Sequence, residues 1–204
     1  MEPTYLTALG FLDLVGIGMF ALSGALLAAQ KRQDFVTFLF FAVVTGVGGG
    51  TVRDLLIGAP VFWVHQNWIL LICAAAALLA WFTPHELWGR GGLVWADAIG
   101  IAAYATYGAA KALAFGIAPL PAVGMGVLTA CFGGIIRDLL AGEPSILLRQ
   151  EFYVTAAAVS AALMVGLRAG GLPELTAGAI AISAGFALRA AAIARGWTLP
   201  VYRR

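Results

Sequence analysis

The chain repeats itself at a fixed offset of 84 residues. Residues 13–79 align without a gap on residues 97–163, and 21 of these 67 positions are identical. Within residues 43–60 the identity rises to 10 of 18 positions, and an Arg-Asp pair and a proline both recur there. Chance similarity between Ala- and Gly-rich segments does not account for such matches at one ungapped offset. The sequence therefore predicts two copies of one structural unit.

The composition places both units in a membrane. Hydrophobic residues make up 62% of the 204 residues, charged residues only 11%, and the mean hydropathy is +0.94. Soluble domains carry about 25% charged residues, so water is not the solvent for most of this surface. Charges, prolines and polar clusters divide the chain into seven apolar segments, each near the ~20 residues that span a bilayer as a helix. The expected helices are residues 6–29, 35–57, 67–83, 93–115, 119–141, 151–169 and 174–195.

Each unit contains three of these segments, and this odd number predicts an inverted repeat. After three crossings the chain lies on the opposite side of the membrane, so the second copy must sit upside down. We expect an all-α integral membrane protein with seven transmembrane helices. Residues 1–83 form the first three-helix repeat, 84–169 the inverted second repeat, and 170–204 the seventh helix with its tail. Inverted repeats are common in transporters, whose working site lies near the midplane where the halves meet.

The positive charges predict how the protein is oriented in the inner (plasma) membrane. Most of them fall on one side of the predicted spans: Lys31, Arg32, Arg90, Arg149, Arg195, Arg203 and Arg204. The other side has Arg168, with Lys111 near a helix end. Because cytoplasmic loops carry the excess of Lys and Arg, we expect the N-terminus outside and the C-terminus in the cytoplasm.

No sequence motif indicates catalysis, a cofactor or a metal site. Cys73 and Cys131 lie in apolar runs and are expected to be buried thiols, while His65 and His85 are far apart in loops. Nucleophile elbows, P-loops and zinc-binding helix motifs are missing from the sequence, and a net charge of +2 gives no basic tract for nucleic acid. We expect no enzyme activity, no cofactor and no nucleic-acid partner; membrane lipid and a transported small solute remain.

Glycine clusters occupy the middle of the second and fifth apolar segments. Each Gly costs a helix about 1 kcal/mol relative to Ala, so a run of them permits a kink or local unwinding. Carbonyls freed in this way must line water or find a partner. We predict two broken helices flanking a solute pathway, with nearby threonines adding oxygen atoms; the alternative is that small residues let helices pack closely. The residues concerned are Gly48, Gly49, Gly50, Gly133 and Gly134, with Thr45, Thr51 and Thr129.

Ionisable residues recur at equivalent positions of the two repeats. They are Asp13, Arg53 and Asp54, with their copies Asp97, Arg137 and Asp138. Charges at membrane depth usually face partners or a water-filled cavity. The topology puts Asp13 beside Arg53 in the outer half and Asp97 beside Arg137 in the inner half, so we predict two symmetry-related ion pairs. The alternative is that the arginines snorkel to the interfaces.

Lys111 breaks the repeat, because its counterpart is Leu27. A lysine late in the fourth span is expected to snorkel to the outer interface. Otherwise it projects into the pathway, where its charge is a candidate gating charge.

The doubled pattern Gly48-Gly49-Gly50-Thr51-Val52-Arg53-Asp54 and Gly133-Gly134-Ile135-Ile136-Arg137-Asp138 resembles the prokaryotic trimeric intracellular cation (TRIC) channels. These belong to a broader bacterial family whose repeated unit is called a glycine transporter domain. The resemblance covers nearly the whole chain, and it implies a homotrimer whose subunits each carry a pore between kinked second and fifth helices, with potassium as the preferred ion. Phe132 replaces the first glycine of the second triplet, so the two kinks need not be equal.

Two functions follow from this resemblance. A monovalent, potassium-preferring cation channel suits a lining of oxygen atoms with little net charge. A secondary transporter of glycine or another small amino acid is the alternative, because some bacterial relatives look like glycine carriers and half-helix ends bind zwitterions.

The orientation can be tested with reporters. One fused after Arg204 is expected to be active in the cytoplasm, and one inserted between Arg32 and Gln33 to agree with it. A tag before Glu2 should be labelled from outside by an impermeant reagent. Finding both termini on one side would contradict the seven-span topology.

Overall fold

The computed structural model describes residues 8–88, 91–145 and 151–200, and within them it is helical. All seven expected segments form helices whose ends lie within a few residues of the predicted ones. The long helices are α1 (Ala8–Gln30), α2 (Phe35–Leu56), α3 (Asn67–Phe82), α5 (Gly92–Ala114), α6 (Pro119–Leu140), α7 (Tyr153–Ala169) and α8 (Glu174–Arg195). Two single turns, η2 (Phe62–His65) and α4 (His85–Trp88), lie in the connections.

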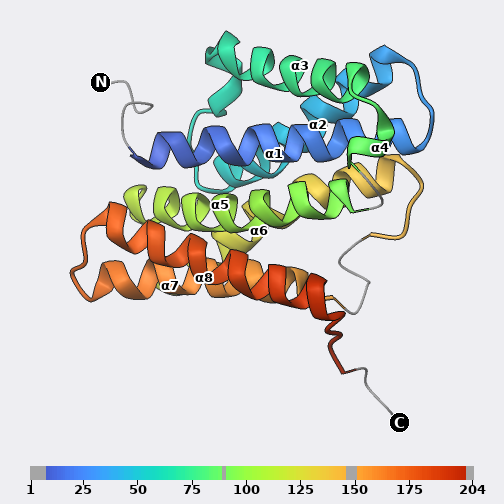
Figure 1. Ribbon diagram of the computed structural model, residues 1–204. Coiled ribbons are helices and arrows are strands. Elements are labelled where there is room, and N and C mark those ends of the chain that lie inside the picture. Colours follow the sequence, from blue (N-terminus) through green and yellow to red (C-terminus); the bar gives the residue numbers. More distant parts are fainter. Residues whose placement is uncertain (1–7, 89–90, 146–150, 201–204) are drawn as a thin grey trace.

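The two repeats pack in matching ways around a shared centre. In each repeat the three helices contact one another, and the repeats meet where α1 packs on α5 and α2 packs on α6 (Figure 1). In Figure 1 α1 runs from left to right and α5 from right to left, the antiparallel relation that the inverted repeat predicted. The last helix, α8, packs on α7 and α5 and hardly touches the first repeat.

Local sequence signals explain several helix ends. The carboxylate of Asp34 accepts a hydrogen bond from the backbone N–H of Thr37 at 2.8 Å, which caps α2 and holds the pKa of Asp34 below its ordinary value. Gly58 and Gly142, equivalent residues of the two repeats, follow α2 and α6 with φ of +70° and +67°. Only glycine adopts this conformation readily, so both helices stop at the same place in each repeat.

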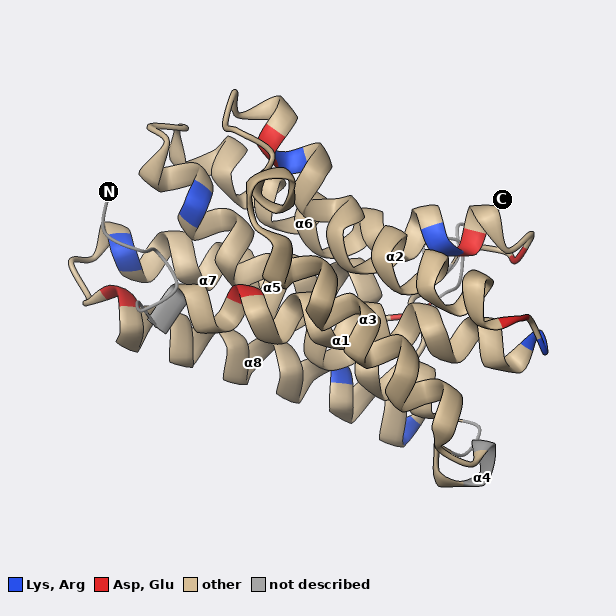
Figure 2. Ribbon diagram, turned by 90° about the horizontal axis from the view of Figure 1, so that it is seen from above, with Lys and Arg blue, Asp and Glu red and all other residues tan. Residues whose placement is uncertain are grey.

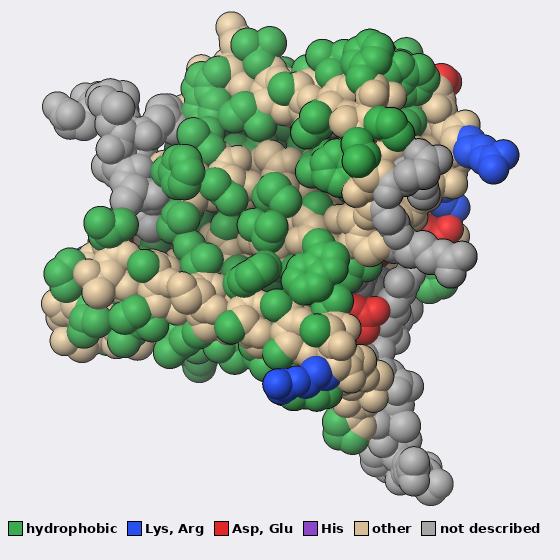
Figure 3. All heavy atoms as spheres, viewed as in Figure 1, with side chains coloured by type: hydrophobic (Ala, Val, Ile, Leu, Met, Phe, Trp, Pro, Cys, Tyr) green, Lys and Arg blue, Asp and Glu red, His purple; other side chains and the backbone are tan. Residues whose placement is uncertain are grey.

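The surface is apolar enough to be solvated by lipid. Four helices, α1, α2, α6 and α8, have the length and composition to cross a membrane, and α3 and α7 are shorter apolar helices. Large hydrophobic side chains point outward, such as Val36, Phe82 and Leu120, which are 74%, 76% and 82% exposed. Figure 3 shows one face covered mainly by hydrophobic side chains, and Figure 2 shows the charged residues gathered mostly toward the two ends of the bundle. The fold is that of an integral membrane protein.

The glycine clusters do not unwind their helices. Both α2 and α6 remain α-helical through Gly48–Gly50 and Gly133–Gly134. The prediction of local unwinding is therefore wrong, while a kink at these glycines stays a prediction. The glycines act instead through the absence of a side chain.

Close packing at the α2–α6 crossing is what these glycines provide. A Cβ atom on Gly49 would lie 2.0 Å from the carbonyl oxygen of Thr129, and one on Gly133 would lie 2.4 Å from that of Thr45. Gly49 and Gly133 are repeat equivalents, as are Thr45 and Thr129, so one contact is made twice about a local twofold axis. The structure therefore supports the alternative interpretation, in which the small glycines let α2 and α6 approach each other closely.

Alanine substitutions test this role. We expect Gly49→Ala and Gly133→Ala to lower the free energy of unfolding by about 1–3 kcal/mol, because the methyl group overlaps a carbonyl oxygen and forces the helices apart. Gly124→Ala in α6 is the control, since its Cβ meets nothing within 4 Å. It should be neutral or stabilising by up to about 1 kcal/mol through helix propensity. Thermal unfolding in detergent compares the three; equal melting temperatures would contradict the close contact.

Candidate functional site

The first charge cluster, defined as Asp13, Arg53, Asp54 and Lys111, lies between α1, α2 and α5. Arg53 donates from Nε to Asp54 Oδ1 at 2.8 Å, and Lys111 donates from Nζ to the same oxygen at 2.8 Å. The other carboxylate oxygen of Asp54 accepts the backbone N–H of Phe62 at 3.1 Å. Asp54 thereby joins α2 to α5 and to the turn η2.

The second charge cluster, defined as Asp97, Arg137 and Asp138, lies between α1, α5 and α6. Nη1 of Arg137 donates to Asp97 Oδ1 at 2.8 Å and to the hydroxyl of Ser23 at 2.9 Å, while Nε donates to Asp138 Oδ1 at 2.9 Å. Arg137 and the three residues that it contacts are at most 5% exposed. The predicted Asp97–Arg137 ion pair is confirmed, and it ties three helices together.

The corresponding Asp13–Arg53 pair does not form. Arg53 pairs with Asp54, and Asp13 interacts with Arg53 and Lys111 only as nearby charges. One difference between the clusters is that the second has Ser23 where the first has its repeat equivalent Tyr107. The Arg53 guanidinium lies over the Tyr107 ring in a cation–π contact, with 5.0 Å between the guanidinium carbon and the ring centroid.

Lys111 does not snorkel to the interface. Its side chain is only 16% exposed and is bonded to Asp54. The expectation of an interfacial lysine is wrong because a buried carboxylate lies within reach on α2. With Lys111 the first cluster has two acidic and two basic side chains, whereas the second, which has Leu27 at that position, has two acidic side chains and one basic.

Several buried polar atoms near the clusters have no hydrogen-bond partner in the part of the chain that the structure describes. They are Asp13 Oδ1, Thr45 Oγ1, Arg53 Nη1 and Nη2, Asp97 Oδ2 and the hydroxyl of Tyr153. A polar atom buried without a partner is costly, and in native proteins it commonly marks water, an ion or a functional site. These atoms belong to α1, α2, α5 and α7, the helices that surround the α2–α6 crossing.

The predicted threonines divide into two kinds. Thr45 lies at the crossing with its hydroxyl unpartnered. Thr51 and Thr129 donate to carbonyl oxygens of their own helices, those of Val47 at 2.7 Å and Met125 at 2.6 Å. Of the three, Thr45 is the one whose hydroxyl has no hydrogen-bond partner among the described residues, and a donating threonine still keeps oxygen lone pairs that can coordinate a cation.

One buried charge escaped the sequence analysis. Arg189 of α8 is 2% exposed and forms an ion pair with Glu151, and its guanidinium lies over the ring of Tyr153, 5.7 Å from the centroid. An arginine in an apolar span is itself a signal of a buried partner. Because α8 lies outside the repeat, Arg189 has no equivalent residue whose recurrence would point to it.

The chain is similar to known membrane proteins over most of its length. A family model described as Glycine transporter matches residues 10–85 and again 94–169. A UPF0126 membrane protein of Vibrio cholerae is 37% identical over 196 residues, which cover 94% of this chain and 81% of the relative. The UPF0126 inner membrane protein YadS of Escherichia coli K12 is 43% identical over 150 residues, 72% of each chain.

A solved structure has the same fold. The TRIC trimeric intracellular cation channel orthologue from Rhodobacter sphaeroides is 42% identical and superposes with a TM-score of 0.87. The match covers 94% of this chain and 100% of that chain.

Double-mutant cycles distinguish the two clusters. Arg137→Ala or Asp97→Ala strands a buried charge, a change that costs about 3–5 kcal/mol, and the double variant should cost clearly less than the sum. The cycle on Arg53 and Asp13 should show much weaker coupling because the two are not bonded. Unfolding free energies in detergent measure both cycles.

A surface pair supplies the control for these cycles. Lys31 and Glu143 form an ion pair with side chains 34% and 38% exposed, and their coupling should stay below about 1 kcal/mol. Equal coupling in the two buried cycles would contradict the different pairing of the clusters.

Proposed function

This chain belongs to the Glycine transporter family, and we propose that it is a monovalent cation channel that prefers potassium. Its similarity to the TRIC channel orthologue of Rhodobacter sphaeroides supports this proposal. The chain assembles as a homotrimer, as the name of that relative states for its own assembly. Each subunit carries its own pathway, which follows the α2–α6 crossing between the two charge clusters.

The observation that carries this proposal is the group of unpartnered polar atoms around the crossing. One side-chain oxygen atom of each of Asp13, Thr45, Asp97 and Tyr153 is buried without a hydrogen-bond partner among the described residues. Oxygen atoms in such positions can replace the hydration shell of a cation. In lipid, unpaired polar groups are tolerated where they line a water-filled cavity, which fits a pathway along these helices.

The crossing is closed in this conformation. Gly49 and Gly133 lie so close to carbonyl oxygens of the facing helix that no ion fits between α2 and α6 at this point. Conduction therefore requires α2 and α6 to separate. The glycine contacts hold the helices together by close packing alone, so a second conformation is accessible without breaking hydrogen bonds at this point.

Lys111 is the candidate gating charge. Its bond to Asp54 joins α5 to α2, one of the two helices that must separate. Moving one charge through the membrane field is worth about 2.3 kcal/mol per 100 mV, which is comparable to the strength of a charged hydrogen bond. A voltage that draws Lys111 away from Asp54 would free α2.

Currents in a planar bilayer test the proposal. Purified protein under a KCl gradient should give single-channel currents that reverse near the potassium equilibrium potential. Lys111→Met should shift the voltage dependence of opening because the gating charge is lost. Lys31→Met removes a lysine paired with Glu143 at the surface and should leave both properties unchanged.

The alternative function has its own signature. A carrier would show saturable uptake of labelled glycine into liposomes and no unitary currents. That outcome would identify the protein as a carrier and contradict the proposed channel function, whatever the effect of Lys111→Met.

A further inference from the structure

The second repeat has a cavity where the first repeat is filled. In the first repeat the indole of Trp81 packs edge-on against Phe35 and Phe38, with centroid distances of 5.5 and 5.0 Å. At the offset of 84 residues these positions become Val165, Pro119 and Ala122. Three aromatic rings are thus replaced by three small side chains.

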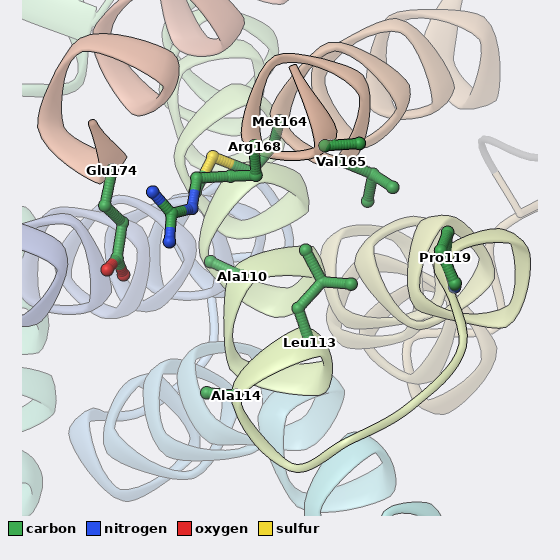
Figure 4. A pocket seen from close by; sticks show the side chains of 9 residues that line it. Ala110, Leu113, Ala114, Pro119, Met164, Val165, Arg168 and Glu174 are labelled. Atoms are coloured by element: carbon green, nitrogen blue, oxygen red, sulfur yellow. The ribbon is translucent and has the colours of Figure 1, made fainter. Parts of the chain in front are cut away.

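The resulting cavity lies between α5, α6, α7 and the start of α8. Its volume is about 340 Å³, and its wall includes the apolar side chains of Leu113, Pro119, Met164 and Val165 (Figure 4). All four helices have an end here, at the left of Figure 1. The cavity therefore opens at the depth where lipid headgroups meet the hydrocarbon of the bilayer.

Two opposite charges also line this cavity. Figure 4 shows the guanidinium of Arg168 and the carboxylate of Glu174 directed toward the same side of it. Arg168 donates one N–H to the carbonyl of Leu172 at 2.8 Å, which orients the guanidinium and leaves further donors for a ligand. Arg168 and Glu174 form no salt bridge with each other among the described residues.

A second apolar space reaches the same carboxylate. A groove of about 330 Å³ runs between α1 and α8, lined by Phe11, Leu12, Leu175 and Ile182, and Glu174 borders it as well. Glu174 thus borders both apolar spaces, and Arg168 lines the first of them.

We propose that this cavity binds one phosphatidylethanolamine molecule of the adjacent leaflet. Its phosphate accepts hydrogen bonds from Arg168, whose planar fork suits phosphate oxygens, and its ammonium group donates to Glu174. One acyl chain occupies the cavity and the other the groove. Phosphatidylglycerol lacks the cation, and phosphatidylcholine lacks N–H donors. A free amino acid would leave the apolar walls uncovered.

Native mass spectrometry of the delipidated protein, titrated with each of the three phospholipids, tests the site. Wild type should bind phosphatidylethanolamine roughly tenfold more tightly than the other two, the difference expected for one charged hydrogen bond. Glu174→Gln should abolish the preference over phosphatidylcholine. Arg168→Gln should weaken binding of all three lipids.

Filling the cavity gives a second, steric test. Val165→Trp restores the residue of the first repeat and should abolish binding, whereas Ala162→Trp, on the exposed side of α7 and outside the cavity lining, should not. Equal binding by both tryptophan variants, or the absence of a headgroup preference in wild type, would overturn the proposal.

The same spectra report the number of subunits. If Val165→Trp separates the oligomer while Ala162→Trp does not, a neighbouring subunit fills the cavity and the lipid assignment is wrong. Melting temperatures confirm that each variant is folded, and the two charge variants test the site without adding bulk.

Discussion

The contact on which the rest of the structure depends is the approach of two glycines to two threonine carbonyls at the α2–α6 crossing. Gly49 meets Thr129, and Gly133 meets Thr45, each at a distance that excludes any side chain. Because helices in lipid gain little from burying apolar surface, such backbone contact is a main source of their association. The crossing brings α1 against α5, and this in turn sets the charge clusters between helices of different repeats. A single carbon atom at either glycine would disturb the whole arrangement.

The repeats share a backbone plan but differ at the positions that carry chemistry. Tyr107 in place of Ser23 packs its ring on the Arg53 guanidinium, and Lys111 in place of Leu27 balances the charge of the first cluster. The second cluster keeps the direct Asp97–Arg137 bond. Duplicated structure with altered side chains thus gives the two charge clusters different electrostatics. If the proposed pathway runs between them, its two ends present different charges to a cation.

Much of the fold could be predicted because its signals are local or periodic. Apolar length located the helices, the 84-residue offset located the repeats, and the odd number of spans required the inversion. The errors arose where a side chain from another helix decides the outcome. Helix propensity alone does not tell an unwound glycine from a packed one, since the answer lies in the carbonyl of the facing helix. The partner of Lys111 is 57 residues away, and the ring that packs on Arg53 comes from the other repeat.

The seventh helix has a mechanical consequence for the molecule. It packs on α5 and α7, and Arg189 extends from it to Glu151 beside Tyr153, so every one of these attachments is made to the second repeat. The two halves are therefore not equivalent as moving bodies. The second repeat and α8 form a unit of four packed helices, whereas the first repeat has three. If conduction requires α2 and α6 to separate, as proposed, the three helices of the first repeat would move against this larger unit, and Asp54 would move away from Lys111.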